Sequence, residues 1–127
     1  MKASPTSRSL AECRVRGWIA QVVERWNPHA RVRQDLFGVI DLVVIAPDDS
    51  GAARLIGIQA TSGSNAGPRM RKAEEEPRLR AWLHAGGAFE VWAWRKVGER
   101  GKRKVWALRR VSAELAPGGV VWNEEAA

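Results

Sequence analysis

The segment from residue 39 to residue 46 constrains the fold most, because it is almost continuously apolar and rich in β-branched residues. Its sequence is Val-Ile-Asp-Leu-Val-Val-Ile-Ala, with Phe37-Gly38 before it and a turn-forming Pro-Asp-Asp-Ser-Gly segment after it. Such a pattern is typical of a central strand that is buried on both faces. A strand of this kind requires layers on both sides of its sheet, which favours an α/β fold.

The rest of the chain predicts helices on either side of such a sheet. The predicted order is α-β-β-β-α-β-β, a mixed central sheet flanked by helices. The expected elements are a helix over about 9–26 ending at Asn27-Pro28, strands over 31–36, 39–46 and 54–61, a helix over about 68–85 with a kink at Pro77, and strands over 89–97 and 104–110. We expect a flexible N-terminus at 1–8, a single domain over 9–111 and a weakly patterned C-terminal tail at 112–127.

Cysteine content and hydropathy indicate the compartment. Cys13 is the single cysteine, so no internal disulfide can form, which fits a reducing environment. The sequence contains no run of 18 apolar residues and no signal-peptide pattern. We therefore expect a cytoplasmic protein without a membrane partner.

Positive charge is concentrated in one segment. The formal net charge is +7, and residues 95–110 hold eight basic residues against Glu99 alone. One interpretation is a solvated hairpin whose charge serves solubility. Clustering favours the other, a strip that binds phosphates. The candidate nucleic-acid-binding residues are Arg95, Lys96, Arg100, Lys102, Arg103 and Lys104.

Two polar residues interrupt apolar strands. Asp41 lies within the segment 39–46, and Gln59 interrupts the next predicted strand. Hairpin pairing can bring them side by side, and two oxygen ligands on adjacent strands suit a hard cation such as Mg²⁺. The alternative for Asp41 is a buried carboxylate satisfied by backbone N–H groups or an arginine.

Glu12 is a third candidate ligand. It shares a helical stripe with Val15 and Ile19, which would direct it toward the strand ends. The alternative is a surface acid near a helix N-terminus, where the helix dipole favours negative charge.

This arrangement resembles the PD-(D/E)XK nuclease superfamily, which includes restriction endonucleases and Holliday junction resolvases. The family has an αβββαβ core with a Glu on the first helix, an Asp on the second strand and an acid-X-Lys on the third. The matching positions are Glu12, Asp41 and Gln59-Ala60-Thr61, within residues 9–97. The resemblance implies a restriction endonuclease-like fold, here with an αβββαββ core.

The motif departs from the family pattern at two positions. Gln59 stands where the acid is usual, as in the Mrr-type restriction enzymes, and its carbonyl oxygen can still be a ligand. Thr61 stands where the family has lysine, and a threonine hydroxyl can orient water but cannot supply positive charge. Lys72 is the best replacement for that charge, with Arg69 or Arg33 as further options.

The resemblance implies metal-dependent hydrolysis of DNA phosphodiester bonds. Asp41, Gln59, the Ala60 carbonyl and Glu12 would hold Mg²⁺ or Mn²⁺. The catalytic set would be Glu12, Asp41, Gln59, Thr61 and Lys72, and a homodimer would be needed for two symmetric cuts. Two alternatives remain: an inactive member that binds nucleic acid through residues 95–110, and an unrelated basic α/β module that binds a protein or an RNA scaffold.

Overall fold

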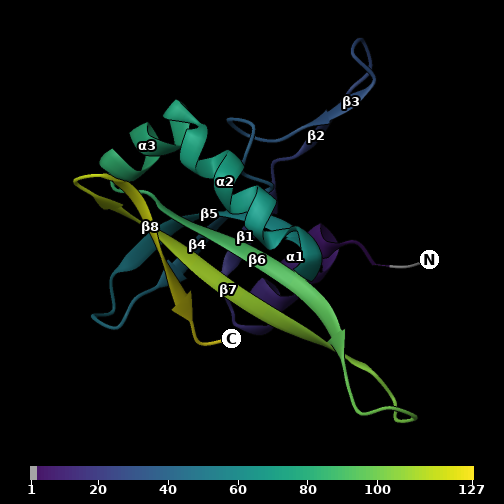
Figure 1. The fold of residues 1–127 in the computed structure, drawn as a ribbon. Coiled ribbons are helices and arrows are strands. Elements are labelled where there is room, and N and C mark those ends of the chain that lie inside the picture. Colours follow the sequence, from purple (N-terminus) through teal and green to yellow (C-terminus); the bar gives the residue numbers. More distant parts are fainter. Residues whose placement is uncertain (1–2) are drawn as a thin grey trace.

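The centre of the molecule is a six-stranded mixed sheet, seen in a computed structural model that describes residues 3–127 (Figure 1). The strand order is β1-β4-β5-β6-β7-β8. The β5–β6 pair is parallel, and every other neighbouring pair is antiparallel. The strands are β1 (Ile19–Val22), β4 (Leu42–Pro47), β5 (Ala53–Ser62), β6 (Ala88–Val97), β7 (Val105–Ala116) and β8 (Gly119–Glu125). The expectation of a mixed α/β fold is confirmed at this level.

The apolar segment around β4 lies inside the sheet, as predicted, but it is fully buried on one face only, because Leu42, Val44 and Ala46 are buried whereas Val43 is half-buried and Ile45 is exposed. β4 pairs with β1 on one side and with β5 on the other, with Leu42 opposite Ile58. The strand begins at Leu42 rather than at residue 39, because residues 36–40 form a tight turn in which Leu36 bridges Ile40. Phe37 and Gly38 lie at the tip of this turn.

Helices cover the sheet on its two faces. Helix α1 (Pro5–Val15) packs on one face, where Cys13 joins a core that includes Leu42, Ile58 and Trp92. Helices α2 (Ala66–Glu75) and α3 (Pro77–His84) pack on the other face, where the core includes Ala73, Leu79, Phe89 and Val91. The break between α2 and α3 falls at Pro77, as the sequence predicted. The short helix η1 (Gly63–Asn65) joins β5 to α2.

The predicted helix over residues 9–26 is wrong at both ends. Met1 and Lys2 of the expected flexible segment lie outside the described residues, but the Ser4 hydroxyl caps a helix that begins at Pro5. The helix ends at Val15, and Gly17 then adopts a φ of +76°, a left-handed conformation that ends helices. The apolar residues that suggested a longer helix instead enter the edge strand β1.

A two-stranded ribbon occupies the connection between β1 and β4. Its strands are β2 (Arg25–Asn27) and β3 (Val32–Gln34), which pair antiparallel and project away from the body of the molecule (Figure 1). This ribbon replaces the end of the predicted helix and most of the predicted strand over 31–36. Its two ends return to the same place in the fold, next to the start of β4.

The C-terminal segment belongs to the sheet. Residues 112–116 continue β7, and β8 pairs with β7 at the sheet edge, with Val111 opposite Glu124. The expectation of a weakly patterned tail after residue 111 is therefore corrected: β8 is an edge strand whose sequence, Gly-Val-Val-Trp-Asn-Glu-Glu, lacks the regular alternation of apolar and polar residues that predicts a strand. Within residues 3–127, no helix has the length and apolarity needed to cross a membrane.

Candidate metal centre and nucleic-acid interface

Asp41 and Gln59 lie side by side where β4 and β5 meet. The Gln59 Nε2 donates a hydrogen bond of 2.6 Å to Asp41 Oδ2, and the backbone N–H of Ala60 donates one of 2.9 Å to the same oxygen. Both side chains are buried, with exposed fractions of 2% for Asp41 and 3% for Gln59. The expectation that the β4–β5 hairpin brings the two residues together is confirmed.

Two further carboxylates complete a cluster that the sequence did not reveal. One oxygen each from Glu24, Asp35 and Asp41 lies within 4.8 Å of the others. Glu24 directly precedes β2 and Asp35 directly follows β3, so both acids stand at the base of the ribbon. The cluster therefore joins the base of the ribbon to the start of β4.

The backbone around Asp41 explains why these acids converge. Leu36 and Ile40 exchange hydrogen bonds of 2.8 and 2.9 Å across a tight turn, which places Asp35 and Asp41 at its two open ends. Phe37 and Gly38, with φ of 55° and 77°, form the tip of this turn. The Asp41 carbonyl accepts a 3.3 Å hydrogen bond from the Glu24 N–H, which holds the third acid nearby.

Two oxygens of this cluster are buried without a hydrogen-bond partner among the described residues. They are Asp41 Oδ1 and Gln59 Oε1. Burying a polar atom without a hydrogen bond raises the free energy of the folded state, so such atoms indicate a partner that is not part of the described chain. Two unpaired oxygens beside two more carboxylates form an all-oxygen donor set of the type that binds Mg²⁺ or Mn²⁺.

The electrostatics of the cluster also favour a bound cation. Burial raises the pKa of Asp41 to about 8, the neighbouring Asp35 carboxyl adds to the rise, and the Ala60 N–H opposes it. Arg33 makes a 3.2 Å ion pair with Glu24, which offsets part of the negative charge. A divalent cation would favour the charged form of Asp41, because its positive charge would compensate the cost of burying that carboxylate beside two other acids.

Basic side chains share a cavity with the cluster. A space of about 270 Å³ is lined by Asp41, Gln59 and Ala60 together with Glu24, Asp35, Arg33, Arg69 and Lys72. Arg69 and Lys72 stand three residues apart on α2, which places them on the same side of that helix. Within residues 3–127, neither forms an ion pair with a carboxylate. The three residues considered as replacements for the motif lysine therefore all reach the cavity.

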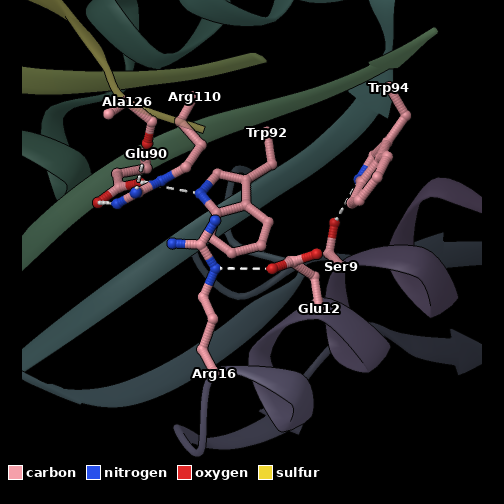
Figure 2. Close-up of polar contacts among 8 residues, drawn as sticks. All are labelled: Ser9, Glu12, Arg16, Glu90, Trp92, Trp94, Arg110 and Ala126. Carbon is pink, nitrogen blue, oxygen red and sulfur yellow. Dashed lines mark hydrogen bonds and ion pairs between the residues drawn. The ribbon is translucent and has the colours of Figure 1, made fainter. Parts of the chain in front are cut away.

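Glu12 lies elsewhere, which corrects its expected place beside Asp41. It is on α1, which covers the opposite face of the sheet, and its carboxylate accepts a 2.8 Å hydrogen bond from Arg16 next to Trp92 (Figure 2). The helix stripe used to orient Glu12 was inferred from a helix that continues past residue 15, which α1 does not. Glu24 and Asp35 supply the additional acids instead.

Thr61 is buried two residues beyond Gln59 on β5, on the same side of the strand. It is not among the described residues that line the cavity. The structure therefore places Thr61 near the cluster without giving its hydroxyl a contact to it.

The basic segment 95–110 forms the long β6–β7 hairpin, which extends from the sheet (Figure 1). Two of its eight basic residues form ion pairs: Arg109 pairs with Glu124, and Arg110 makes a buried 2.9 Å pair with Glu90 (Figure 2). The other six are exposed: Arg95, Lys96, Arg100, Lys102, Arg103 and Lys104. These six are the residues selected from the sequence as a candidate nucleic-acid interface.

The tryptophans of β6, Trp92 and Trp94, have a structural role. Trp92 is fully buried and donates a 2.9 Å hydrogen bond to Glu90, and Trp94 donates one of 3.0 Å to Ser9 on α1 (Figure 2). Both rings pack under α1, so neither is available to stack on a nucleic-acid base.

We compared the chain with known protein families, curated proteins and solved structures. No protein-family model matches the chain, and no match was found among curated proteins or solved structures.

Proposed function

We propose that this chain is a metal-dependent nuclease that hydrolyses phosphodiester bonds of DNA. The observation that carries the proposal is the cluster of Glu24, Asp35 and Asp41, in which two buried oxygens lack a partner in the described part of the chain, beside two cations of α2 that form no ion pair there. Acids that hold a metal and cations that face a phosphate are the two parts that such hydrolysis needs.

The order of elements supports the resemblance to the PD-(D/E)XK superfamily. Without the β2–β3 ribbon, the first six elements follow the order α1-β1-β4-β5-α2/α3-β6, with Asp41 at the start of the second strand and Gln59 on the third. The ribbon is then an insertion between the first two strands. Glu24, two residues after the first strand ends, would take the place of the helix acid that the family pattern expects at Glu12.

The residues present fit a divalent cation. The carboxylates of Glu24, Asp35 and Asp41 would hold it, together with Gln59 Oε1 and the Ala60 carbonyl. When bound, Mg²⁺ or Mn²⁺ supplies an acidified water and neutralises charge on the phosphate. The amides of Gln59 and Ala60 fix the orientation of the Asp41 carboxylate through their hydrogen bonds to Oδ2.

The chain's own cations act on the phosphate. Hydrolysis adds water to phosphorus and breaks the bond to the leaving oxygen, which gains a proton as the attacking water loses one. Negative charge grows on the phosphoryl oxygens during this step, and Lys72 and Arg69 are placed to stabilise it. The β6–β7 hairpin would bind the flanking backbone through its six exposed basic residues.

One observation favours a second candidate, an inactive protein of the same fold that binds nucleic acid. The family's lysine position holds Thr61, which carries no charge and does not line the cavity. In this alternative the hairpin binds DNA while the acid cluster does not support catalysis.

A cleavage assay separates the two candidates. Single-stranded, duplex and branched DNA are incubated with the protein in Mg²⁺, in Mn²⁺ and in EDTA. The nuclease proposal expects products with 5′-phosphate or 3′-phosphate ends in at least one metal and none in EDTA. Binding without cleavage in either metal would favour the inactive protein. A homodimer, which two symmetric cuts require, stays a prediction that sedimentation of the protein–DNA complex would test.

A further inference from the structure

The β2–β3 ribbon combines positive charge with an exposed aromatic ring. Between Glu24 and Asp35 the sequence holds Arg25, Arg31, Arg33 and His29 and no acid. Trp26 on β2 has an exposed fraction of 55%. Basic residues interleaved with an aromatic side chain are typical of surfaces that bind single-stranded nucleic acid.

Trp26 differs from the other six tryptophans in having no partner. Each of the others makes a hydrogen bond, an aromatic contact or a cation–π contact. For Trp26, no such contact exists among the described residues. An exposed indole beside arginine side chains is able to stack on a planar ligand such as a nucleic-acid base.

The ring also stands close to the candidate metal centre. Trp26 lies two residues after Glu24, and its cross-strand partner is Arg33. Arg33 pairs with Glu24 and lines the cavity of the acid cluster. Side chains directly opposite each other in an antiparallel pair lie about 5 Å apart at Cβ, so the indole is one cross-strand pair away from the cavity.

We propose that the ribbon holds an unpaired nucleotide beside the phosphodiester bond to be cut, with the base stacked on Trp26. The arginines of the ribbon contact the adjacent phosphates. An indole can stack on a base only where that base's face is uncovered, which excludes the interior of a duplex. The substrate class is therefore single-stranded nucleic acid, or a duplex with an unpaired segment at the cutting site. That this nucleic acid is a substrate rests on the proposed nuclease function. That the ribbon binds it does not depend on that function.

The test measures binding rather than cleavage. Fluorescence anisotropy of a labelled 15-nucleotide oligo-dT is recorded in EDTA, with a blunt duplex of equal length as the second probe. Trp26→Ala should weaken oligo-dT binding by about tenfold to a hundredfold, the range expected for losing one stacked base, and leave duplex binding within about twofold. Trp26→Phe should retain most of the affinity, because phenylalanine still stacks.

Trp106→Ala is the matched control. Trp106 is also exposed, at 41%, but the guanidinium of Arg8 covers its ring at 3.7 Å from the centroid. Trp106 also contacts Lys96 of the basic hairpin, at 5.4 Å from the ring centroid, so its removal should weaken oligo-dT binding much less than Trp26→Ala does and should affect both probes alike. Circular dichroism of all variants confirms that they are folded, which is expected because Trp26 lies on the surface.

Three results would overturn the inference: no oligo-dT binding by the wild type, equal losses for Trp26→Ala and Trp106→Ala, or an equal loss on the duplex probe. A loss specific to Trp26 and oligo-dT, found in a protein that cuts no DNA in Mg²⁺ or Mn²⁺, would support the ribbon and refute the nuclease proposal. Cleavage of DNA with no effect of Trp26→Ala on oligo-dT binding would do the reverse.

Discussion

Gln59 donates a 2.6 Å hydrogen bond from its amide to Asp41 across the β4–β5 hairpin, and each of the two side chains keeps one buried oxygen that has no hydrogen-bond partner within residues 3–127. The hydrogen bond fixes both groups, so the two unpaired oxygens are held in a defined position before any ligand arrives. Oxygen ligand atoms that are held in place in this way are typical of a binding site. In a purely structural polar contact, all of the buried polar atoms have hydrogen-bond partners.

Replacing Asp41 by Asn should abolish DNA cleavage and leave DNA binding unchanged. The substitution keeps the size of the side chain but removes the central carboxylate of the cluster, which a divalent cation needs. Cleavage is measured by gel in Mn²⁺, and binding is measured by anisotropy in EDTA. Asp49→Asn, at an exposed turn remote from the cluster, is the control. Wild-type cleavage by the Asp41 variant would place the activity elsewhere or in a contaminant.

Lys72→Ala and Arg69→Ala should each lower the cleavage rate, by about tenfold to a thousandfold for the residue that stabilises the phosphate. Each lines the cavity from α2, whereas Arg71 on the same helix does not, so Arg71→Ala is the matched control. Single-turnover rates at saturating protein isolate the chemical step from binding. If neither change lowers the rate and Thr61→Lys raises it, the chain is a weakened relative rather than one with a relocated cation.

The salt dependence of DNA binding should depend on the turn of the β6–β7 hairpin. For Z phosphate contacts, the slope of log K against log salt is about −0.9Z. Replacing Arg100, Lys102 and Arg103 by Ala should therefore flatten the slope by about 3. The effect should be similar for different DNA sequences, because phosphate contacts do not read bases.

Arg109→Ala serves as the control for the hairpin, since its guanidinium is already engaged by Glu124. It should change the slope much less than the triple substitution. A triple variant with wild-type affinity and slope would show that the hairpin charge serves solubility alone.

The stability of the metal-free protein should fall as pH rises. Asp41 keeps its proton in the folded state up to about pH 8, whereas its ordinary value, expected in the unfolded chain, is 3.8. Between these values the folded state binds more protons, so this group's contribution is fully present below about pH 4 and is lost as pH rises to about 8. The free energy of unfolding should decrease by up to about 1.4 kcal/mol per pH unit from this group.

Asp41→Asn removes the titrating group and should flatten this dependence. Urea unfolding in EDTA, followed by circular dichroism at intervals from pH 5 to pH 8.5, measures it. The variant should become more stable than the wild type toward pH 8, because it carries no buried charge at that position. Parallel pH profiles for the two proteins would show that Asp41 does not titrate in this range.

The sequence predicts those residues of the site that differ in polarity from their immediate neighbours. Asp41 and Gln59 are polar residues in apolar strands, and the turn between those strands sets their register. Lys72 and Arg69 could also be predicted from the sequence, because the helix that follows β5 must return across the same face of the sheet. These inferences need only strand alternation and one hairpin.

The positions of the other two acids, Asp35 and Glu24, are set by turns of the chain. Asp35 lies six residues before Asp41 with Phe37-Gly38 between them, a spacing that already predicts a tight hairpin with the two acids opposite each other. Glu24 was hidden within a helix expected to continue to residue 26. Val15, Trp18 and Ile19 fit a helical period, but Gly17 interrupts it and begins the turn into β1. Periodicity alone cannot distinguish these outcomes when the strand is short and at an edge.

Titration of the metal-free protein with Mn²⁺, followed by the electron paramagnetic resonance signal of the free ion, tests the metal centre most directly. We expect the wild type to bind one or two ions, with affinity lost in Asp41→Asn, reduced in Glu24→Gln and Asp35→Asn, and unchanged in Glu12→Gln on the opposite face of the sheet. A wild type that binds no Mn²⁺, or an Asp41→Asn variant that binds it as well as the wild type, would contradict a metal centre at this cluster.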